Sequence, residues 1–357
     1  MSKLLIHIGM EKTGSTTIQS VLSNSRKALA QKAIHFPRIS RKSNHNFLAS
    51  AYIPMTSSRI SRGLAKYDRE EGKRVVKLFK KDILKAVSKF ENTIISGEHL
   101  FRLQPAEIKF LHDDLLKAGV SDIRVIGYIR DPVSFYLSFV QQELKGSSRF
   151  PSPSSFYIPY ADRIQAWQEN FDCEFFNFAE TRAGEEGLTG HFFSRVEDFF
   201  GPHVEMSEAS NSILNESLSS EEMQILQHFR KHIFTKSDGK FNDETNRLLK
   251  TFLIFRDHRW KKPQLSEGVV EVITIRHSNE LDFLVLECGF NADLVPMDSS
   301  ASTLVLEDCS VTNIVSNFDE NLYHELYSRL ILTLIRQPFF NLSRSLRSRR
   351  LKRGKKR

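Results

Sequence analysis

The chain has 357 residues, 40% of them hydrophobic, which suffices for a substantial core in one large domain or two ordinary ones. Its three cysteines are widely spaced and form no C-x-x-C pair, which argues against a disulfide framework or a zinc site. The formal charge of +8 comes from residues 341–357, which hold nine Lys or Arg and no acid, whereas the rest has 42 basic and 43 acidic residues. A nearly neutral body argues against specific nucleic-acid binding.

The first predicted elements are a strand, a glycine-containing loop and a helix. Residues 4–8 form a short apolar run with β-branched members, and from Ile18 the apolar positions recur at helical spacing. Between them, residues 9–17 carry glycines and hydroxyl groups. Because the first N–H groups of a helix lack internal partners and lie at the positive end of its dipole, this arrangement predicts a site for a phosphate or sulfate.

The position of the lysine indicates which anion the loop binds. In the nucleotide loop G-x-x-x-x-G-K-[ST] the lysine follows the second glycine, whereas here it precedes Gly14 by two residues, which disfavours a standard ATP or GTP loop. The segment K-T-G-S-T-T resembles the 5′-phosphosulfate loop of sulfotransferases, which binds 3′-phosphoadenosine 5′-phosphosulfate (PAPS). A solvated strand-to-helix turn is the alternative. The resemblance implies that PAPS is bound by Lys12, Thr13, Gly14, Ser15, Thr16 and Thr17.

A second strand end carries an arginine. Residues 123–129 are rich in β-formers, and R-D-P follows, with Asp131 suited to cap a helix and Pro132 suited to its first position. This resembles the 3′-phosphate site of sulfotransferases, in which a serine lies eight residues after the arginine. The resemblance implies that Arg130 and Ser138 bind the 3′-phosphate, since a guanidinium donates two parallel hydrogen bonds to a phosphate. A surface ion pair of Arg130 is the alternative.

Candidate bases follow a third predicted strand, residues 93–96. Ligands collect at the carboxyl ends of parallel strands, and sulfuryl transfer to a hydroxyl requires a general base. Sulfotransferases place a His or Glu in this part of the chain, and the resemblance to carbohydrate-type relatives favours Glu98 over His99. A helix-start acid and a loop histidine are the structural alternatives. The same resemblance implies that His45 faces the acceptor, whereas a histidine bonded to its own turn is equally consistent with the sequence.

The resemblance spans roughly residues 3–290 and implies an α/β fold: a three-layer sandwich with a central parallel sheet, the P-loop-like sulfotransferase fold. We expect a sulfotransferase domain over residues 1–290, a helical extension over 291–340 and a basic tail over 341–357. Apolar residues at helical spacing in 322–335 support the extension. The three-part organisation therefore separates the predicted site from the charged end of the chain.

The predicted function is that of a bacterial, carbohydrate-type, PAPS-dependent sulfotransferase. It transfers a sulfuryl group to a hydroxyl or amine of an acceptor, with a saccharide favoured, by in-line displacement and without a metal. The absence of a signal peptide or long apolar run favours the cytoplasm. The basic tail is expected to contact the inner face of an anionic membrane, or to act only as a solubilising segment. Two alternatives remain: a phosphotransferase with an atypical nucleotide loop, and a non-catalytic module whose tail binds membrane or nucleic acid.

Overall fold

The computed structural model describes residues 2–39, 42–57, 59–64, 67–201, 203, 217–235, 243–291 and 309–336. The predicted basic tail lies outside these residues. Contacts divide the chain into two units. The first unit comprises Met1–Phe135, Tyr157–Leu214 and Thr274–Ser300, and the second comprises Tyr136–Phe156, Asn215–Ile273 and Ala301–Arg357.

The first unit contains a five-stranded, fully parallel sheet in the order β2-β3-β1-β4-β5. Its strands are β1 Ser2–Gly9, β2 Ile34–His35, β3 Asn92–Ser96, β4 Val120–Ile129 and β5 Asp172–Asn177. The central strand β1 pairs with β3 from Lys3 to His7 and with β4 from Ser2 to Gly9. The strand order reverses direction at β1, so the loop that follows β1 lies at the switch point where α/β proteins bind ligands.

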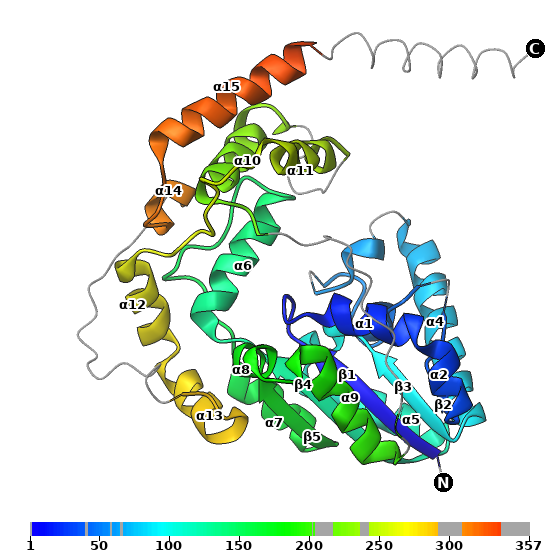
Figure 1. The fold of residues 1–357 in the computed structure, drawn as a ribbon. Helices are drawn as coiled ribbons and strands as arrows, with labels where there is room; N and C mark the ends of the chain where they lie inside the picture. The colour runs from blue at the N-terminus through cyan, green and yellow to red at the C-terminus, as the bar shows by residue number, and fades with distance from the viewer. Residues whose placement is uncertain are drawn as a thin grey trace, which may run out of the picture. The chain divides into compact units, whose positions relative to one another are not determined.

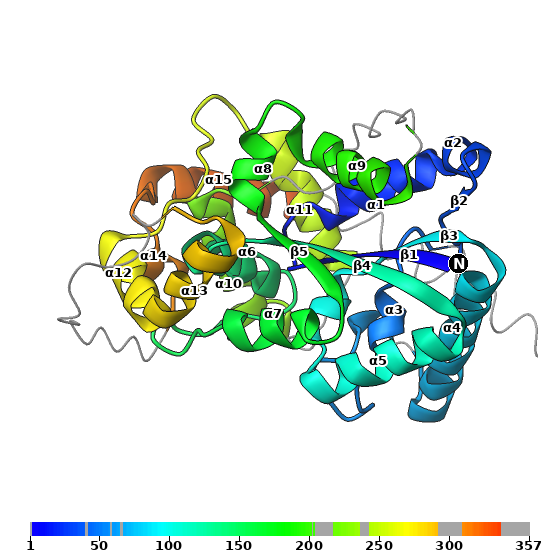
Figure 2. The same cartoon turned by 90° about the horizontal axis from the view of Figure 1, so that it is seen from below.

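Helices cover both faces of this sheet, as Figures 1 and 2 show, and the predicted α/β class with a three-layer parallel-sheet sandwich is confirmed. On one face lie α1, α2, α8 and α9, and on the other lie α4, α5 and α7. The helices and 3₁₀ turns of this unit are α1 Ser15–Asn24, α2 Arg26–Gln31, α3 Asn46–Ala49, η1 Arg62–Leu64, α4 Arg69–Lys89, η2 Glu98–Arg102, α5 Pro105–Lys117, α7 Tyr160–Gln168, α8 Phe178–Ala183, α9 Gly187–Phe200 and α13 Ser278–Cys288.

The core of the first unit forms where apolar helix faces meet the buried strands. Leu5 on β1 packs with Ile18 and Leu22 of α1 and with Phe192 and Val196 of α9 in one cluster of buried side chains. The helical spacing of these residues places them on one side of their helices. Burial of this surface stabilises the sheet and also holds α1, whose first turn borders the switch point, against β1.

Capping residues set two helix starts that periodicity alone placed less accurately. The sequence predicts a helix from about residue 73, but α4 begins at Arg69 because Asp68 accepts a hydrogen bond from the Glu71 N–H at 2.8 Å. The sequence also predicts a strand over residues 173–178, but β5 ends at Asn177, because the Asn177 side chain accepts a hydrogen bond from the Ala179 N–H at 3.0 Å and caps α8. In both places a hydrogen bond from a backbone N–H to a capping side chain fixes the start of the helix.

The second unit is helical. It contains most of α6 (Pro132–Leu144) and of α12 (Glu267–Arg276), each of which crosses a boundary between the units, and all of α10 Ser220–His232, α11 Asp243–Phe255, α14 Val311–Ile314 and α15 Glu320–Arg336. Helix α10 packs against α14 and α15. Gln227 on α10 also donates to the carbonyl oxygens of Ser148 and Cys309, at 3.1 and 2.8 Å. The helical extension therefore packs on elements that precede residue 290 in the chain.

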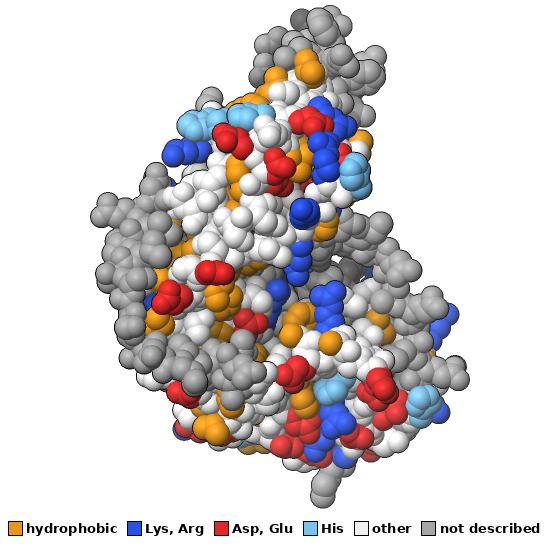
Figure 3. All heavy atoms as spheres, turned by 60° about the vertical axis from the view of Figure 1, so that its left-hand side comes forward, with side chains coloured by type: hydrophobic (Ala, Val, Ile, Leu, Met, Phe, Trp, Pro, Cys, Tyr) orange, Lys and Arg blue, Asp and Glu red, His pale blue; other side chains and the backbone are white. Residues whose placement is uncertain are grey.

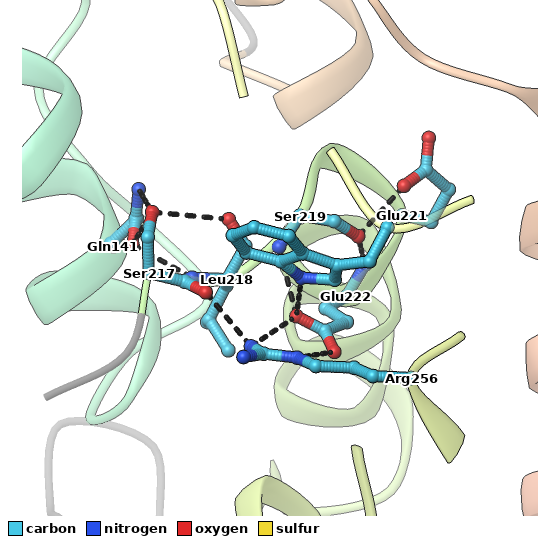
Figure 4. A network of polar contacts seen from close by, with 8 residues as sticks. Gln141, Ser217, Leu218, Ser219, Glu221, Glu222 and Arg256 are labelled. Atoms are coloured by element: carbon cyan, nitrogen blue, oxygen red, sulfur yellow. Dashed lines mark hydrogen bonds and ion pairs between the residues drawn. The ribbon is translucent and has the colours of Figure 1, made fainter. Parts of the chain in front are cut away.

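A buried ion pair organises the second unit, as Figure 4 shows. The Glu222 carboxylate, 2% exposed, accepts from the Ser219 N–H and so closes the capping box at the start of α10. The same carboxylate accepts from Arg256 Nε and Nη2, both at 2.9 Å. Arg256 Nη2 also donates to the Ser217 carbonyl oxygen at 2.8 Å. One guanidinium therefore joins the end of α11 to the start of α10.

Replacing Arg256 with alanine is expected to lower the free energy of unfolding by about 3 kcal/mol, because it leaves the buried Glu222 carboxylate without its cation. Urea denaturation followed by circular dichroism measures the loss. The control is Arg259→Ala, which removes exposed ion pairs to Asp257 and Glu325 and should change stability little. Equal losses in the two variants would contradict the importance of the buried pair.

Acidic and basic side chains are interspersed over the face of the molecule drawn in Figure 3. This distribution agrees with the balanced charge of the chain outside its last residues. Within the described ranges, no helix has both the length and the apolar content needed to cross a membrane.

Candidate functional site

The loop between β1 and α1 exposes the first turn of the helix. Gly14, the N-cap of α1, has φ 72°, and no side chain caps the helix at this position. The N–H groups of Ser15 and Thr16 make no hydrogen bond to the residues that the structure describes, whereas those of Thr17 and Ile18 donate to the Gly14 carbonyl. Unpaired N–H groups at a helix start can hold an anion.

Gly14 is required by both its conformation and its neighbours. Its positive φ is costly for other residues, and a Cβ at this position would overlap the Leu188 side chain and lie 3.4 Å from Phe178 Cε2. Gly14→Ala is therefore expected to lower the free energy of unfolding by about 3 kcal/mol, from backbone strain and overpacking together. Thermal and urea unfolding measure this change.

The matched control is Gly289→Ala. Gly289 has φ 67°, close to that of Gly14, but among the described residues a Cβ there would have nothing within 4 Å. Only the backbone cost, about 1 kcal/mol, should appear. If the two alanine variants lost equal stability, close packing against Leu188 would not be the reason for glycine at position 14.

The hydroxyl groups of the loop have different roles. Thr13 is fully buried, and its Oγ1 donates to the Met10 carbonyl at 2.7 Å, which closes the loop on itself. Ser15 is 2% exposed, and its Oγ makes no well-formed hydrogen bond within the described part of the chain, although it lies beside Glu98 and helps to lower the pKa of that carboxyl. Thr16 and Thr17 are exposed. Ser15, Thr16 and Thr17 therefore line the helix start, whereas Thr13 supports the loop.

Lys12 lies between an acid and a second cation. Its backbone adopts φ 68°, a conformation that side-chain-bearing residues rarely take and that recurs at functional sites. Burial lowers the pKa of its ammonium, the Glu98 carboxylate raises it, and the Arg130 guanidinium lowers it. The structure thus brings together Lys12, Glu98 and Arg130, which the sequence predicts from three separate segments.

Arg130 is held at the end of β4 with its side chain directed at the loop. Its Nη1 donates to the Lys12 carbonyl at 3.2 Å, and its Nε donates to Ser134 Oγ at 2.9 Å. Asp131 caps α6 by accepting from the Ser134 N–H at 2.7 Å, and Pro132 is the first residue of the helix, as predicted. Burial is the main cause that lowers the pKa of Arg130. The guanidinium therefore borders the loop, and the predicted surface ion pair is not its main contact.

Two further residues bear on the predicted 3′-phosphate site. Ser138 lies on α6 in the second unit, half-buried, and its role beside Arg130 stays a prediction. Arg182 on α8 lies near enough to Arg130 for its charge to lower the pKa of that guanidinium. Arg182 was not predicted from the sequence, because its distance from Arg130 in the chain hides the fact that β4 and β5 are adjacent. Arg182 is exposed and supplies a second cation near Arg130.

Glu98 follows β3 directly and points toward the same loop. Its Oε1 accepts from Asn46 Nδ2 at 3.3 Å. Burial raises the pKa of Glu98, whereas the Asn46 hydrogen bond, the Lys12 charge and the Ser15 hydroxyl lower it. Asn46 was not singled out in the sequence, although it is adjacent to His45. The carboxylate is thus held by three partners and has a pKa above that of an ordinary glutamate, as suits a general base.

His99 belongs to a neighbouring polar cluster. Its Nε2 lies 3.9 Å from Glu11 Oε1 and 4.0 Å from Glu98 Oε1. Glu11, from the loop, also pairs with Arg102, at the end of η2. The two candidate bases are therefore side by side, but only Glu98 is in the group that includes Lys12 and Ser15.

The structure corrects the prediction for His45. Its side chain is fully buried, and its Nδ1 accepts from the Ser96 N–H at 3.0 Å while Nε2 donates to the Pro37 carbonyl at 3.0 Å. Burial lowers the pKa of this imidazole to about 4, so it is neutral at physiological pH. With both nitrogens bonded to the main chain, His45 joins β3 to the segment after β2 and faces no acceptor.

The fold and the site define a class: an α/β protein whose parallel sheet presents, at its carboxyl edge, a strand–loop–helix turn bordered by Lys12, Arg130 and Glu98. No protein-family model and no curated protein matches the chain. Among solved structures it is similar to a chain from the PezAT chromosomal toxin-antitoxin system of the human pathogen Streptococcus pneumoniae, at 13% identity and a TM-score of 0.30, covering 70% of this chain and 83% of that one. A likeness at this level carries no argument about function.

Proposed function

We propose that the protein is a PAPS-dependent sulfotransferase that acts on a hydroxyl or amine of an acceptor, with a saccharide as the favoured acceptor. The observation that carries this proposal is the grouping of Lys12, Arg130 and Glu98 around the open first turn of α1. A nucleotide loop of the ATP or GTP type has its lysine after the second glycine, whereas Lys12 precedes Gly14. Two cations and a carboxylate suit transfer from a bisphosphorylated donor to a neutral nucleophile.

The residues present fit such a donor. The N–H groups of Ser15 and Thr16 make no hydrogen bond among the described residues, and the buried Ser15 hydroxyl lies beside the Glu98 carboxylate at the same helix start. A group with several acceptor oxygens would supply the missing partners. Lys12 and the loop residues Thr13 to Thr17 would hold the phosphosulfate end, and Arg130 would hold the 3′-phosphate.

In the proposed mechanism only a few side chains act on the reacting groups. PAPS supplies, when bound, a sulfuryl group joined to a phosphate leaving group. Glu98 accepts the proton of the acceptor hydroxyl, which makes the oxygen more nucleophilic. Lys12 neutralises negative charge that develops on the leaving phosphate oxygen, and the N–H groups of α1 contribute the helix dipole. Positioning and electrostatics thus provide the catalysis, as they do in phosphoryl transfer.

Calorimetric titration with 3′-phosphoadenosine 5′-phosphate, beside ATP with Mg²⁺, tests the donor. We expect the bisphosphate to bind, and Arg130→Ala to weaken it about 10- to 100-fold through loss of charge-assisted hydrogen bonds. Lys109→Gln, an exposed change on α5, is the control and should leave binding intact. Binding of ATP alone would favour the phosphotransferase alternative, and binding of neither would refute the proposal.

The cytoplasm is the proposed location, because Cys173, Cys288 and Cys309 are free thiols, as is usual in a reducing compartment. The tail at residues 341–357 is proposed to contact an anionic membrane surface, as its nine cations suggest. Removal of residues 341–357 should abolish sedimentation with phosphatidylserine vesicles and leave binding of the bisphosphate unchanged.

A further inference from the structure

Helix α7 carries a cation near the candidate base. Tyr160, at the start of α7, donates to the Arg130 carbonyl at 2.9 Å, so the helix is joined to the end of β4. Arg163, one turn later on nearly the same side of α7, lies over the ring of Phe101, 5.7 Å from its centroid. Phe101 belongs to η2, three residues after Glu98, about 6 Å along such a turn. Arg163 therefore lies near η2, the turn whose first residue is the candidate base Glu98.

Arg163 lies near one acid, Glu280, but forms no close ion pair with it. Among the described residues it makes no ion pair within 4 Å, although it is half-buried. Its neighbouring cations are already paired, Arg59 with Glu107 and Arg102 with Glu11. The adjacent acid, Glu280, uses its two oxygens for Tyr157 Oη and the Ala161 N–H. Burial is the main cause that lowers the pKa of Arg163, the charge of Arg59 lowers it further, and the Glu280 carboxylate raises it from beyond ion-pair distance.

A partly buried guanidinium without an anion is costly, because burial removes hydration that a counter-charge normally replaces. Arg163 keeps part of its surface accessible, so a ligand can reach it. Its planar donors match a carboxylate, which accepts two parallel hydrogen bonds. A ligand that satisfies Arg163 would therefore carry an anionic group, and an acceptor that carries this group would also extend to Glu98.

We propose that Arg163 determines acceptor specificity by binding a carboxylate of the acceptor, so that acidic saccharides are preferred over neutral ones. This inference rests on the proposed sulfotransferase function, since the acceptor is the second substrate of that reaction. In this proposal the hydroxyl that loses its proton lies at Glu98, and the carboxylate lies at Arg163. Arg163 is a binding residue and takes no part in proton transfer.

The test compares 4-nitrophenyl β-glucuronide with 4-nitrophenyl β-glucoside, which differ in the carboxylate. Binding of each to the full-length protein is measured by calorimetry, with and without 3′-phosphoadenosine 5′-phosphate. We expect the glucuronide to bind about tenfold more tightly at low salt, as for a charge-assisted hydrogen bond, and the preference to shrink as salt screens it. Arg163→Gln should remove the preference, Arg163→Lys should keep part of it, and the control Lys109→Gln should keep all of it. Thermal unfolding verifies that each variant is folded.

Equal binding of the two glycosides to the unaltered protein, or binding of neither, overturns the inference, and so does a preference that survives in Arg163→Gln. Affinity for the bisphosphate is measured in the same titrations and should be the same in all three variants. Failure of the bisphosphate to bind, with the glucuronide preference intact, would refute the proposed function and support the anion site at Arg163. The two failures are thus distinguishable.

Discussion

Replacing Lys12 with methionine is expected to lower kcat for sulfuryl transfer by about 10²- to 10³-fold, the usual effect of removing one group that stabilises developing charge. Lys12 lies in the loop before α1, where burial lowers its pKa and the Glu98 carboxylate raises it, so its ammonium acts in a site with little competing water. Methionine keeps the length and apolar stem of the side chain and removes only the charge. Single-turnover measurements report the chemical step.

The matched control is Lys27→Met, on the exposed side of α2, which should retain the full rate. Because the charge on the leaving oxygen grows in the transition state, kcat and kcat/KM should fall together. A Lys12→Met enzyme that keeps more than a tenth of kcat would contradict the proposed role.

Replacing Glu98 with glutamine is expected to lower kcat by about 10²- to 10⁴-fold, because the amide cannot accept the proton of the acceptor. The change keeps the shape of the side chain, so binding of 3′-phosphoadenosine 5′-phosphate should be unaltered. His99→Gln serves as the comparison and should have a smaller effect, since His99 is 4.0 Å from Glu98 and outside the group around Lys12. The reverse order of effects would identify His99 as the base.

The dependence of rate on pH gives an independent test of Glu98. Burial raises the pKa of this carboxyl above its ordinary value of 4.5, and the active form is the carboxylate. Activity should therefore decline as the pH falls through that raised pKa, at a higher pH than for an exposed glutamate. Lys12→Met removes a charge that lowers the pKa of Glu98, so its residual activity should decline at a still higher pH. A pH profile of kcat/KM without this shift would contradict the coupling of the two residues.

Much of the first unit could be predicted from short patterns. The apolar runs in β1, β3 and β4 were recognisable because strands buried in a parallel sheet have nearly continuous apolar character. The positions of Gly14, Arg130 and Glu98 at strand ends followed from the same patterns. The short strand β2, of two residues, was not predicted, because so few residues have no detectable period.

The interpretation of His45 shows where local patterns were insufficient. A histidine beside polar residues is compatible with a ligand contact and with a buried structural bond, and only the chain around it decides. Here the Ser96 N–H and the Pro37 carbonyl occupy both ring nitrogens. Asn46, next in the chain, is the residue that reaches Glu98. Neighbouring side chains in an irregular segment point in different directions, and the sequence does not encode those directions in a simple period.

What the sequence by itself determined is the set of elements and the residue types at their ends, since apolar periodicity, caps and glycine conformations are local properties of the chain. Only the tertiary structure decided which ends meet: β1 lies between β3 and β4, so the Lys12 loop is adjacent to both Glu98 and Arg130. It also decided that Arg102 forms a direct ion pair with Glu11 whereas Arg163 forms none within 4 Å among the described residues, since an ion pair between distant segments depends on distances that no local pattern contains.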